Sequence, residues 1–259
     1  MGDHSARQID TMTLLGNNEV VLGNSFIVMS REEPRQESSP EITRYVRLLS
    51  TKAPLFEKVS ENTVLVRIPA FDHAFKKDID AVIAKHLDTI LNTENLIIDI
   101  RGNGGGSDVS YASLLPILYT NPIRTVGMEY LSTELNNSRM LGFLQNPHFS
   151  EEEKQWAKDG YDILNQHIGS YINIDEDVTV ETFDKIEPLP KSIGVLVDSS
   201  NGSTAEQFLL AAKQSKKVKL FGQTTAGVLD ISNMYQTDSP SGTFTLYYSL
   251  TKSLRIPHM

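Results

Sequence analysis

The sequence of 259 residues contains no cysteine, which excludes disulfide bonds, thiolate metal sites and a cysteine nucleophile. It has no apolar run near the roughly 18 to 20 residues that a membrane-spanning helix requires. The start Met1-Gly2-Asp3-His4 does not have the pattern of a signal peptide. Basic residues are scarce, because the formal net charge is -9 and the longest basic run is Lys216-Lys217. We therefore expect no nucleic-acid partner.

Motifs that hold metals or nucleotides are missing as well. There is no H-E-x-x-H sequence, and aspartate and histidine do not cluster, so we predict no metal and no organic cofactor. The phosphate-loop pattern G-x-x-x-x-G-K is absent. A dinucleotide fingerprint fits badly in spacing, although Glu129 lies at a tolerable distance for a ribose contact.

The first part of the chain has short β-rich pieces, such as Val20-Val21-Leu22 and residues 25–28, followed by a charged, proline-bearing connection at residues 31–40. These features predict an N-terminal β-rich segment over residues 1–60. Because the chain opens on polar residues and stops just after a strand-like run, we expect truncation at one or both ends.

The rest of the chain has the alternation of an α/β fold. Val64–Ile68 is strand-like, Lys77–Leu91 has helical spacing of apolar residues, and Leu96–Ile100 is a buried type of strand. This order predicts a parallel βαβ crossover. We predict an α/β core over residues 61–259, with a helical insertion at about residues 136–190. Further expected elements are helices at Val109–Tyr119 and Ser203–Lys213 and strands at Thr125–Tyr130, Ser192–Val197, Val218–Phe221, Phe244–Leu250 and Ser253–Ile256.

A glycine-rich loop follows the strand at Leu96–Ile100, with the sequence R-G-N-G-G-G-S at residues 101–107. Glycine has no Cβ atom, so such a backbone adopts positive φ and approaches a ligand closely, with N–H groups free to bind negative charge. The alternative interpretation is a flexible turn.

A second polar segment, D-S-S-N-G-S-T-A-E at residues 198–206, lies between a buried strand and a helix. Ser203 and Glu206 fit a helix-capping box. In the functional interpretation, Ser203 is a nucleophile on a sharp strand-to-helix turn, and the next amide lies at the positive end of the helix dipole. The segment alone leaves both open.

Together, the two segments resemble the C-terminal processing (tail-specific) peptidases and their tricorn-like relatives. The resemblance rests on L-I-I-D-I-R-G-N-G-G-G-S at residues 96–107, G-S-T-A-E at 202–206 and L-F-G-Q-T-T-A-G at 220–227. It covers roughly residues 60 to 256 and implies a crotonase/ClpP-type core of stacked βαβ units.

The resemblance also implies roles for single residues. Ser203 corresponds to the nucleophile, the amide of Thr204 to one oxyanion donor, and an amide of Gly105 or Gly106 to the other. In the processing peptidases a lysine base follows the glycine of the next turn, but Val228 occupies that position here. A Ser-Lys pair at this site is therefore ruled out.

The tricorn-like branch instead uses a histidine from near the N-terminus, in a D-x-H-[ST] context, with a glutamate from the C-terminal end. His4 is the histidine whose surroundings resemble that context, and His73 is the fallback. The expected glutamate would lie beyond Met259. The implied export of relatives points to the cell envelope or the outside of the cell, without a signal segment in this chain.

These observations predict a serine-type endopeptidase that acts on peptides or proteins without a cofactor. Two alternatives stay open: a catalytically inactive, peptide-binding pseudopeptidase, and a crotonase-like acyl-thioester enzyme. The pseudopeptidase is kept open by Val228, and the thioester enzyme by the shared βαβ core.

Overall fold

The computed structural model describes residues 12–15, 19–22, 25–28, 39–147 and 149–255. The chain packs as two units, Met1–Arg47 and Leu48–Met259. In the first unit, β1 (Met12–Leu15), β2 (Glu19–Leu22) and β3 (Ser25–Val28) form an antiparallel meander. The strands expected near residues 20–22 and 25–28 are confirmed.

The helix α2 (Pro40–Ser50) was not expected from the sequence, and it crosses the boundary between the two units. Its first residue is proline, which fits a helix start because its fixed φ is helical and its missing N–H has no partner there in any helix. Glu41 in the first turn and Arg47 in the last complement the helix dipole.

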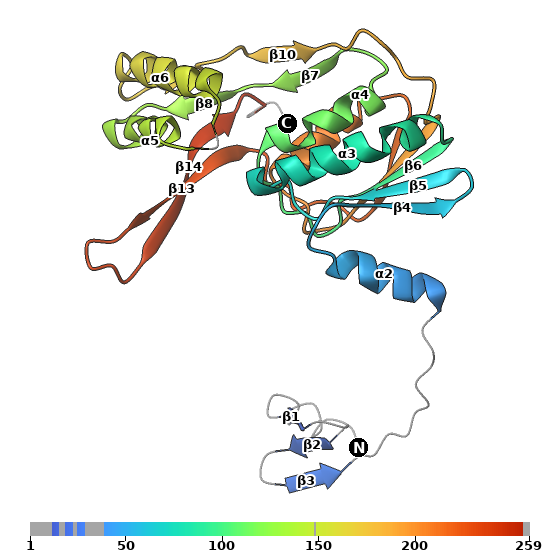
Figure 1. Cartoon of the computed structure of the whole chain (residues 1–259). Helices are drawn as coiled ribbons and strands as arrows, with labels where there is room; N and C mark the ends of the chain where they lie inside the picture. Colours follow the sequence, from blue (N-terminus) through green and yellow to red (C-terminus); the bar gives the residue numbers. More distant parts are fainter. Residues whose placement is uncertain (1–11, 16–18, 23–24, 29–38, 148, 256–259) are drawn as a thin grey trace. The chain divides into compact units, whose positions relative to one another are not determined.

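The second unit is a mixed α/β structure built on a five-stranded sheet with the order β12-β11-β6-β5-β4 (Figure 1). Its strands are β4 (Leu55–Ser60), β5 (Thr63–Arg67), β6 (Asn95–Asp99), β11 (Ser192–Val197) and β12 (Val218–Gly222). All neighbours are parallel except β4, which forms an antiparallel hairpin with β5. The register brings Val66, Ile98 and Val195 side by side, and all three are buried.

Helices connect the parallel strands. α3 (Lys76–Leu91) follows the short 3₁₀ helix η2 (His73–Phe75) and joins β5 to β6, and α7 (Thr204–Ala212) joins β11 to β12. The predicted βαβ crossover is confirmed, because β5 and β6 are parallel neighbours joined by α3, which buries Ile79, Ile83 and Ile90 at helical spacing. The single helix expected at Val109–Tyr119 is instead a 3₁₀ helix, η3 (Asp108–Leu114), followed by the one-turn α4 (Leu115–Leu118).

Three aromatic rings meet in the core beneath the glycine loop. The ring centroid of Phe71 lies 5.7 Å from that of Tyr111 and 5.5 Å from that of Phe208, and Tyr111 lies 5.5 Å from Phe208. The rings are tilted or edge-to-face, which is the favourable geometry for aromatic pairs. Because Phe208 is on α7 and Phe71 follows β5, this cluster fixes the helix after Ser203 against the sheet.

A four-stranded sheet has the order β13-β14-β8-β9, and Figure 1 shows the helices α5 and α6 beside it. The strands of this sheet are β8 (Met128–Leu131), β9 (Tyr171–Ile172), β13 (Ile231–Asp238) and β14 (Thr245–Ser253), and the helices are α5 (Glu134–Leu144) and α6 (Glu151–Asn165). A separate antiparallel pair is formed by β7 (Ile123–Val126) and β10 (Val178–Glu181). A second, smaller core joins Tyr130 and Leu250 of the sheet to Met140, Ala157 and Leu164 of the helices. Ser150 caps α6 in a capping box with Glu153, as the acidic first turn predicts.

The sequence did not predict β13, and β14 is one strand where two were expected. Much of the β13–β14 hairpin is exposed, with Met234 and Leu246 more than half accessible. A hairpin exposed to solvent on both faces lacks the alternation of apolar and polar residues by which a half-buried strand is recognised.

Within the described part of the chain, no helix has the length and apolarity needed to pass through a membrane. The same residues contain no group of three or more histidine, aspartate or glutamate side chains placed to hold a metal ion.

We predict that Phe208→Ala lowers the free energy of unfolding by about 3 to 5 kcal/mol, because it leaves a cavity in the aromatic cluster. The measurement is urea unfolding followed by circular dichroism. Phe244→Ala is the matched control, since Phe244 is 75% exposed, and should change stability by less than about 0.5 kcal/mol. Equal effects of the two substitutions would contradict the assigned core.

Candidate active site

The carboxyl ends of the neighbouring strands β6 and β11 lead into the two polar segments identified in the sequence. The segments touch through their backbones. A Cβ atom built on Gly105 would lie 2.8 Å from Cβ of Ser203 and 2.7 Å from the carbonyl oxygen of Gly202. These distances are too short for any side chain, so Gly105 is required for Ser203 to lie against the loop.

The other side of the glycine loop rests on the segment after β5. The Phe71 N–H donates to the Gly105 carbonyl at 3.0 Å, and the Ser107 N–H donates to the Phe71 carbonyl at 2.9 Å. Gly106 has a φ of 142°, and a Cβ there would lie 2.3 Å from the Phe71 carbonyl carbon. The glycine loop is thus a strand-like segment held between Phe71 and Ser203 by backbone hydrogen bonds and close contacts.

Two fully buried asparagines connect the loops. Asn201 donates from Nδ2 to the carbonyls of Ile100 at 2.6 Å and Asn103 at 2.9 Å, and its Oδ1 accepts the Asp198 N–H at 2.8 Å. Asn103 donates to the Ile68 carbonyl at 3.2 Å and accepts the Gly105 N–H at 2.9 Å. These bonds satisfy backbone groups that no regular strand pairs. Sequence reasoning did not single out either residue.

Ser203 has φ 53° and ψ −127°, and its side chain makes no capping hydrogen bond. Among the described residues, the only other non-glycine residue with positive φ is Asn233. This backbone conformation is strained, and such strain concentrates at functional sites. The capping-box interpretation of Ser203 and Glu206 is therefore wrong.

Glu206 instead binds the turn that follows β12. Its carboxylate accepts hydrogen bonds from the Thr225 hydroxyl at 2.6 Å and from the backbone N–H groups of Gly227 at 2.7 Å and Val228 at 2.9 Å. Glu206 is only 6% exposed. Three donors to one buried carboxylate fix the turn, and they place Val228 against Gly202, since a Cβ on Gly202 would lie 3.0 Å from Cγ2 of Val228.

The backbone amides near Ser203 differ in their availability. The Gly105 N–H is occupied by Oδ1 of Asn103 at 2.9 Å. For the amides of Gly106 and Thr204, no acceptor is found within the described residues. Thr204 is the first residue of α7, where amides lack intrahelical partners. Gly106 and Thr204 both line the same pocket as Ser203.

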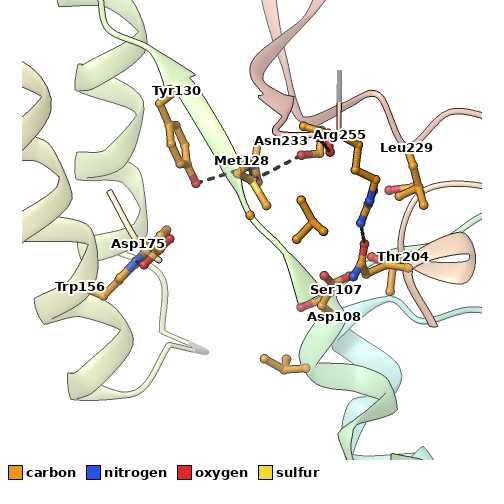
Figure 2. A pocket seen from close by; sticks show the side chains of 18 residues that line it. Ser107, Asp108, Met128, Tyr130, Trp156, Asp175, Thr204, Leu229, Asn233 and Arg255 are labelled. Carbon is orange, nitrogen blue, oxygen red and sulfur yellow. Dashed lines mark hydrogen bonds between the residues drawn. The ribbon is translucent and has the colours of Figure 1, made fainter. Parts of the chain in front are cut away.

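This pocket has a volume of about 460 Å³ and reaches from Ser203 to the second sheet. Figure 2 shows two differing sides: Asp108, Thr204 and Arg255 lie together on one, and Trp156 and Asp175 on the other. On the aromatic side, Nε1 of Trp156 donates to Oδ1 of Asp175 at 2.8 Å. The pocket walls therefore come from both sheets and from α6.

Two charged side chains in the pocket have shifted pKa values. Asp108 is exposed by surface area, but its carboxyl is crowded by protein, and this burial raises its pKa against the opposing effects of the Thr204 side chain and Arg255. Burial likewise lowers the pKa of Arg255, opposed chiefly by Asp108 and Asp230. Hydrogen bonds from a ligand would stabilise the charged forms of both side chains.

The histidines proposed as the base are not among the described residues that line the pocket. His4 lies outside the described residues. His73 is in η2, with its ring centroid 6.3 Å from that of Phe149, and His86 stacks on Phe56 at 4.0 Å. The described histidines are His73, His86 and His167, and none of them lines the pocket.

The model of Peptidase family S41 matches residues 62–255, which is well over half of the chain. The chain belongs to peptidase family S41. The predicted resemblance to tail-specific peptidases is thereby confirmed, and the matched range nearly coincides with the roughly 60 to 256 expected. No curated protein matches this S41 chain.

Among solved structures, the S41 chain is similar to mature CPAF complexed with lactacystin, at 20% identity and a TM-score of 0.51. The match covers 75% of this chain and 44% of that one. The photosystem II D1 C-terminal processing protease matches at 15% identity and a TM-score of 0.44, covering 74% of this chain and 37% of that one. A lipoprotein from Streptococcus agalactiae matches at 18% identity and a TM-score of 0.40, covering 82% and 62%. The S41 chain thus spans less than half the length of CPAF, and their likeness is one of fold.

We predict that Gly105→Ala lowers the free energy of unfolding by about 2 to 3 kcal/mol, because the new Cβ atom overpacks the contact with Ser203. Gly104→Ala is the matched control, since a Cβ at Gly104 meets nothing closer than 3.9 Å, and should change stability by less than about 0.5 kcal/mol. Urea unfolding of both variants measures this difference. A harmless Gly105→Ala would show that the loops do not touch as described.

Proposed function

We propose that the chain is a serine-type endopeptidase that hydrolyses peptide bonds with Ser203 as its nucleophile. The observation that carries the proposal is the strained backbone of Ser203, with φ 53°, pressed against a glycine loop. This arrangement resembles the sharp strand-to-helix turn on which other hydrolases expose a nucleophilic serine. Membership of the S41 family supports it.

In the proposed reaction, Oγ of Ser203 attacks the carbonyl carbon of the scissile bond and gives its proton to a base. The tetrahedral oxyanion forms next, and the amides of Gly106 and Thr204 donate to it. Each such donor contributes a factor of about 10² to 10³ in rate. The leaving amine takes the proton as the C–N bond breaks, and water then hydrolyses the acyl-enzyme. Gly106 is preferred over Gly105 because the Gly105 amide is occupied by Asn103.

For the base we retain the proposal of His4, with His73 as the second candidate. Val228 occupies the lysine position of the processing peptidases, and the hydrogen bond from its amide to Glu206 fixes that position next to Gly202. An aliphatic side chain there has no lone pair to accept a proton, so a base must come from another segment.

The proposal also covers the architecture. We propose that the parallel strands β5, β6, β11 and β12 with their helices are a crotonase/ClpP-type core within residues 61–259. Residues 1–60 are the proposed N-terminal segment, whose last strand, β4, pairs with β5 in the same sheet. The parallel order of β5, β6, β11 and β12 supports this. Peptides or proteins are the proposed substrates, because the chain belongs to a peptidase family.

A peptide-binding pseudopeptidase is the second candidate, and the observation that favours it is Val228 in place of the lysine base. It keeps the pocket and the oxyanion amides but has no turnover. A serine that is not deprotonated reacts slowly with acylating and phosphonylating reagents, which separates the two candidates.

The test is labelling with a fluorophosphonate probe. We expect the parent chain to be labelled and Ser203→Ala to be unlabelled, because the probe reports an activated serine together with its oxyanion amides. Ser199→Ala is the matched control, since Ser199 is an exposed serine of the same loop, and it should be labelled like the parent. His4→Ala and His73→Ala then identify the base by loss of labelling.

Two results would contradict the peptidase proposal. If Ser203→Ala is labelled as strongly as the parent, another residue is the nucleophile. If the folded parent is not labelled and cleaves no denatured protein substrate, the pseudopeptidase is the better description.

A further inference from the structure

Two opposite charges lie beside Ser203 in the pocket, and they come from distant parts of the chain. Asp108 begins η3, directly after the glycine loop, and Arg255 follows β14. Figure 2 shows Asp108 and Arg255 on the same side of the pocket as Thr204. Within the described residues, neither side chain has an ion-pair partner within 4.0 Å. The two charges therefore face the pocket without neutralising each other by direct contact.

Both groups have unused hydrogen-bonding capacity. A guanidinium group carries five N–H donors, and Nη2 of Arg255 donates to Oε1 of Gln207 at 2.8 Å. No second acceptor for Arg255 is found in the described part of the chain. An ionised carboxylate has about four acceptor sites, and the contact of Asp108 with the Thr204 side chain occupies one of them. Free donors and free acceptors are thus present side by side.

The charge of a ligand decides whether it fits both groups. An ammonium ion attracted by Asp108 is repelled by Arg255, and a carboxylate attracted by Arg255 is repelled by Asp108. A neutral amide has a carbonyl oxygen that accepts and N–H groups that donate in one plane. Such a group satisfies both side chains at once without repulsion from either charge.

We propose that Asp108 and Arg255 form a subsite that binds a planar amide group of the substrate next to Ser203. Arg255 donates to the amide oxygen, and Asp108 accepts from the amide N–H. This inference rests on the proposed peptidase function, and it adds how a peptide is oriented at the nucleophile. A bound amide supplies hydrogen bonds to both charges, and hydrogen bonds to charged groups are the strong ones.

The amide has two sources, the main chain of the substrate and the side chain of asparagine or glutamine. Main-chain recognition predicts binding of any extended peptide of matching length. Side-chain recognition predicts a preference for glutamine over glutamate, lysine and alanine at one position. The peptides acetyl-Ala-Ala-X-Ala-Ala-amide, with X as each of these four residues, distinguish the sources.

The experiment uses the full chain with Ser203→Ala, so that binding is measured without turnover. Trp156 is the only tryptophan of the sequence and lines the same pocket, so its fluorescence reports occupancy. We expect Asp108→Asn and Arg255→Lys in this background each to raise the Kd of the tightest peptide about tenfold. Asp162→Asn and Arg124→Lys are the matched controls outside the pocket, and they should leave the Kd unchanged.

Three outcomes would overturn the subsite. One is that no peptide binds at millimolar concentration. Another is that the glutamate or the lysine peptide binds more tightly than the alanine and glutamine peptides. The third is an unchanged Kd in both Asp108→Asn and Arg255→Lys. The peptide comparison needs neither Asp108→Asn nor Arg255→Lys, so it holds even if one of these substitutions prevents folding. Fluorophosphonate labelling of the parent tests Ser203 separately, so failure of the peptidase proposal and failure of the amide subsite are distinguishable.

Discussion

The site depends on one steric constraint, the absence of side-chain volume where the glycine loop passes between Phe71 and Ser203. A Cβ atom on Gly105 would lie 2.8 Å from Ser203, and one on Gly106 would lie 2.3 Å from the backbone of Phe71. Because the backbones touch, the amide of Gly106 reaches the same pocket as Ser203. Any larger residue would separate the loops by more than a hydrogen bond spans.

Close contact between two loops leaves backbone groups that no strand or helix satisfies. Asn103 and Asn201, both fully buried, take over this role with bonds of 2.6 to 3.2 Å. Glu206 does the same for the turn carrying Val228, accepting three bonds. Buried polar groups are tolerated where they are fully paired, and here the pairing holds irregular loops in a fixed geometry.

The pocket has two origins, which explains its chemistry. The loops after the parallel strands contribute Ser203 and the glycine loop, which lie within the residues matched by the S41 family. The antiparallel sheet contributes Arg255 and the strained Asn233, whose Nδ2 donates to the hydroxyl of Tyr130 at 3.4 Å. The loops after the parallel strands thus hold the proposed nucleophile and oxyanion amides. The antiparallel sheet lines the other part of the pocket, which is the part proposed to bind substrate.

The sequence alone determined the βαβ order, because hydrophobic periodicity is a local signal. The facing of the glycine loop and Ser203 was implied by the resemblance to the tail-specific peptidases, and in the structure it follows from β6 and β11 being parallel neighbours that end at the same sheet edge. The sequence did not determine β13, whose exposed hairpin lacks an apolar alternation, or the partner of Glu206. Local spacing favoured a helix cap for Glu206, whereas its carboxylate binds a turn about 20 residues away. Asp108 and Arg255 likewise come to line one pocket only in the tertiary structure. A side chain's hydrogen-bond partner is decided by which distant backbone packs against it, and spacing along the chain does not encode that choice.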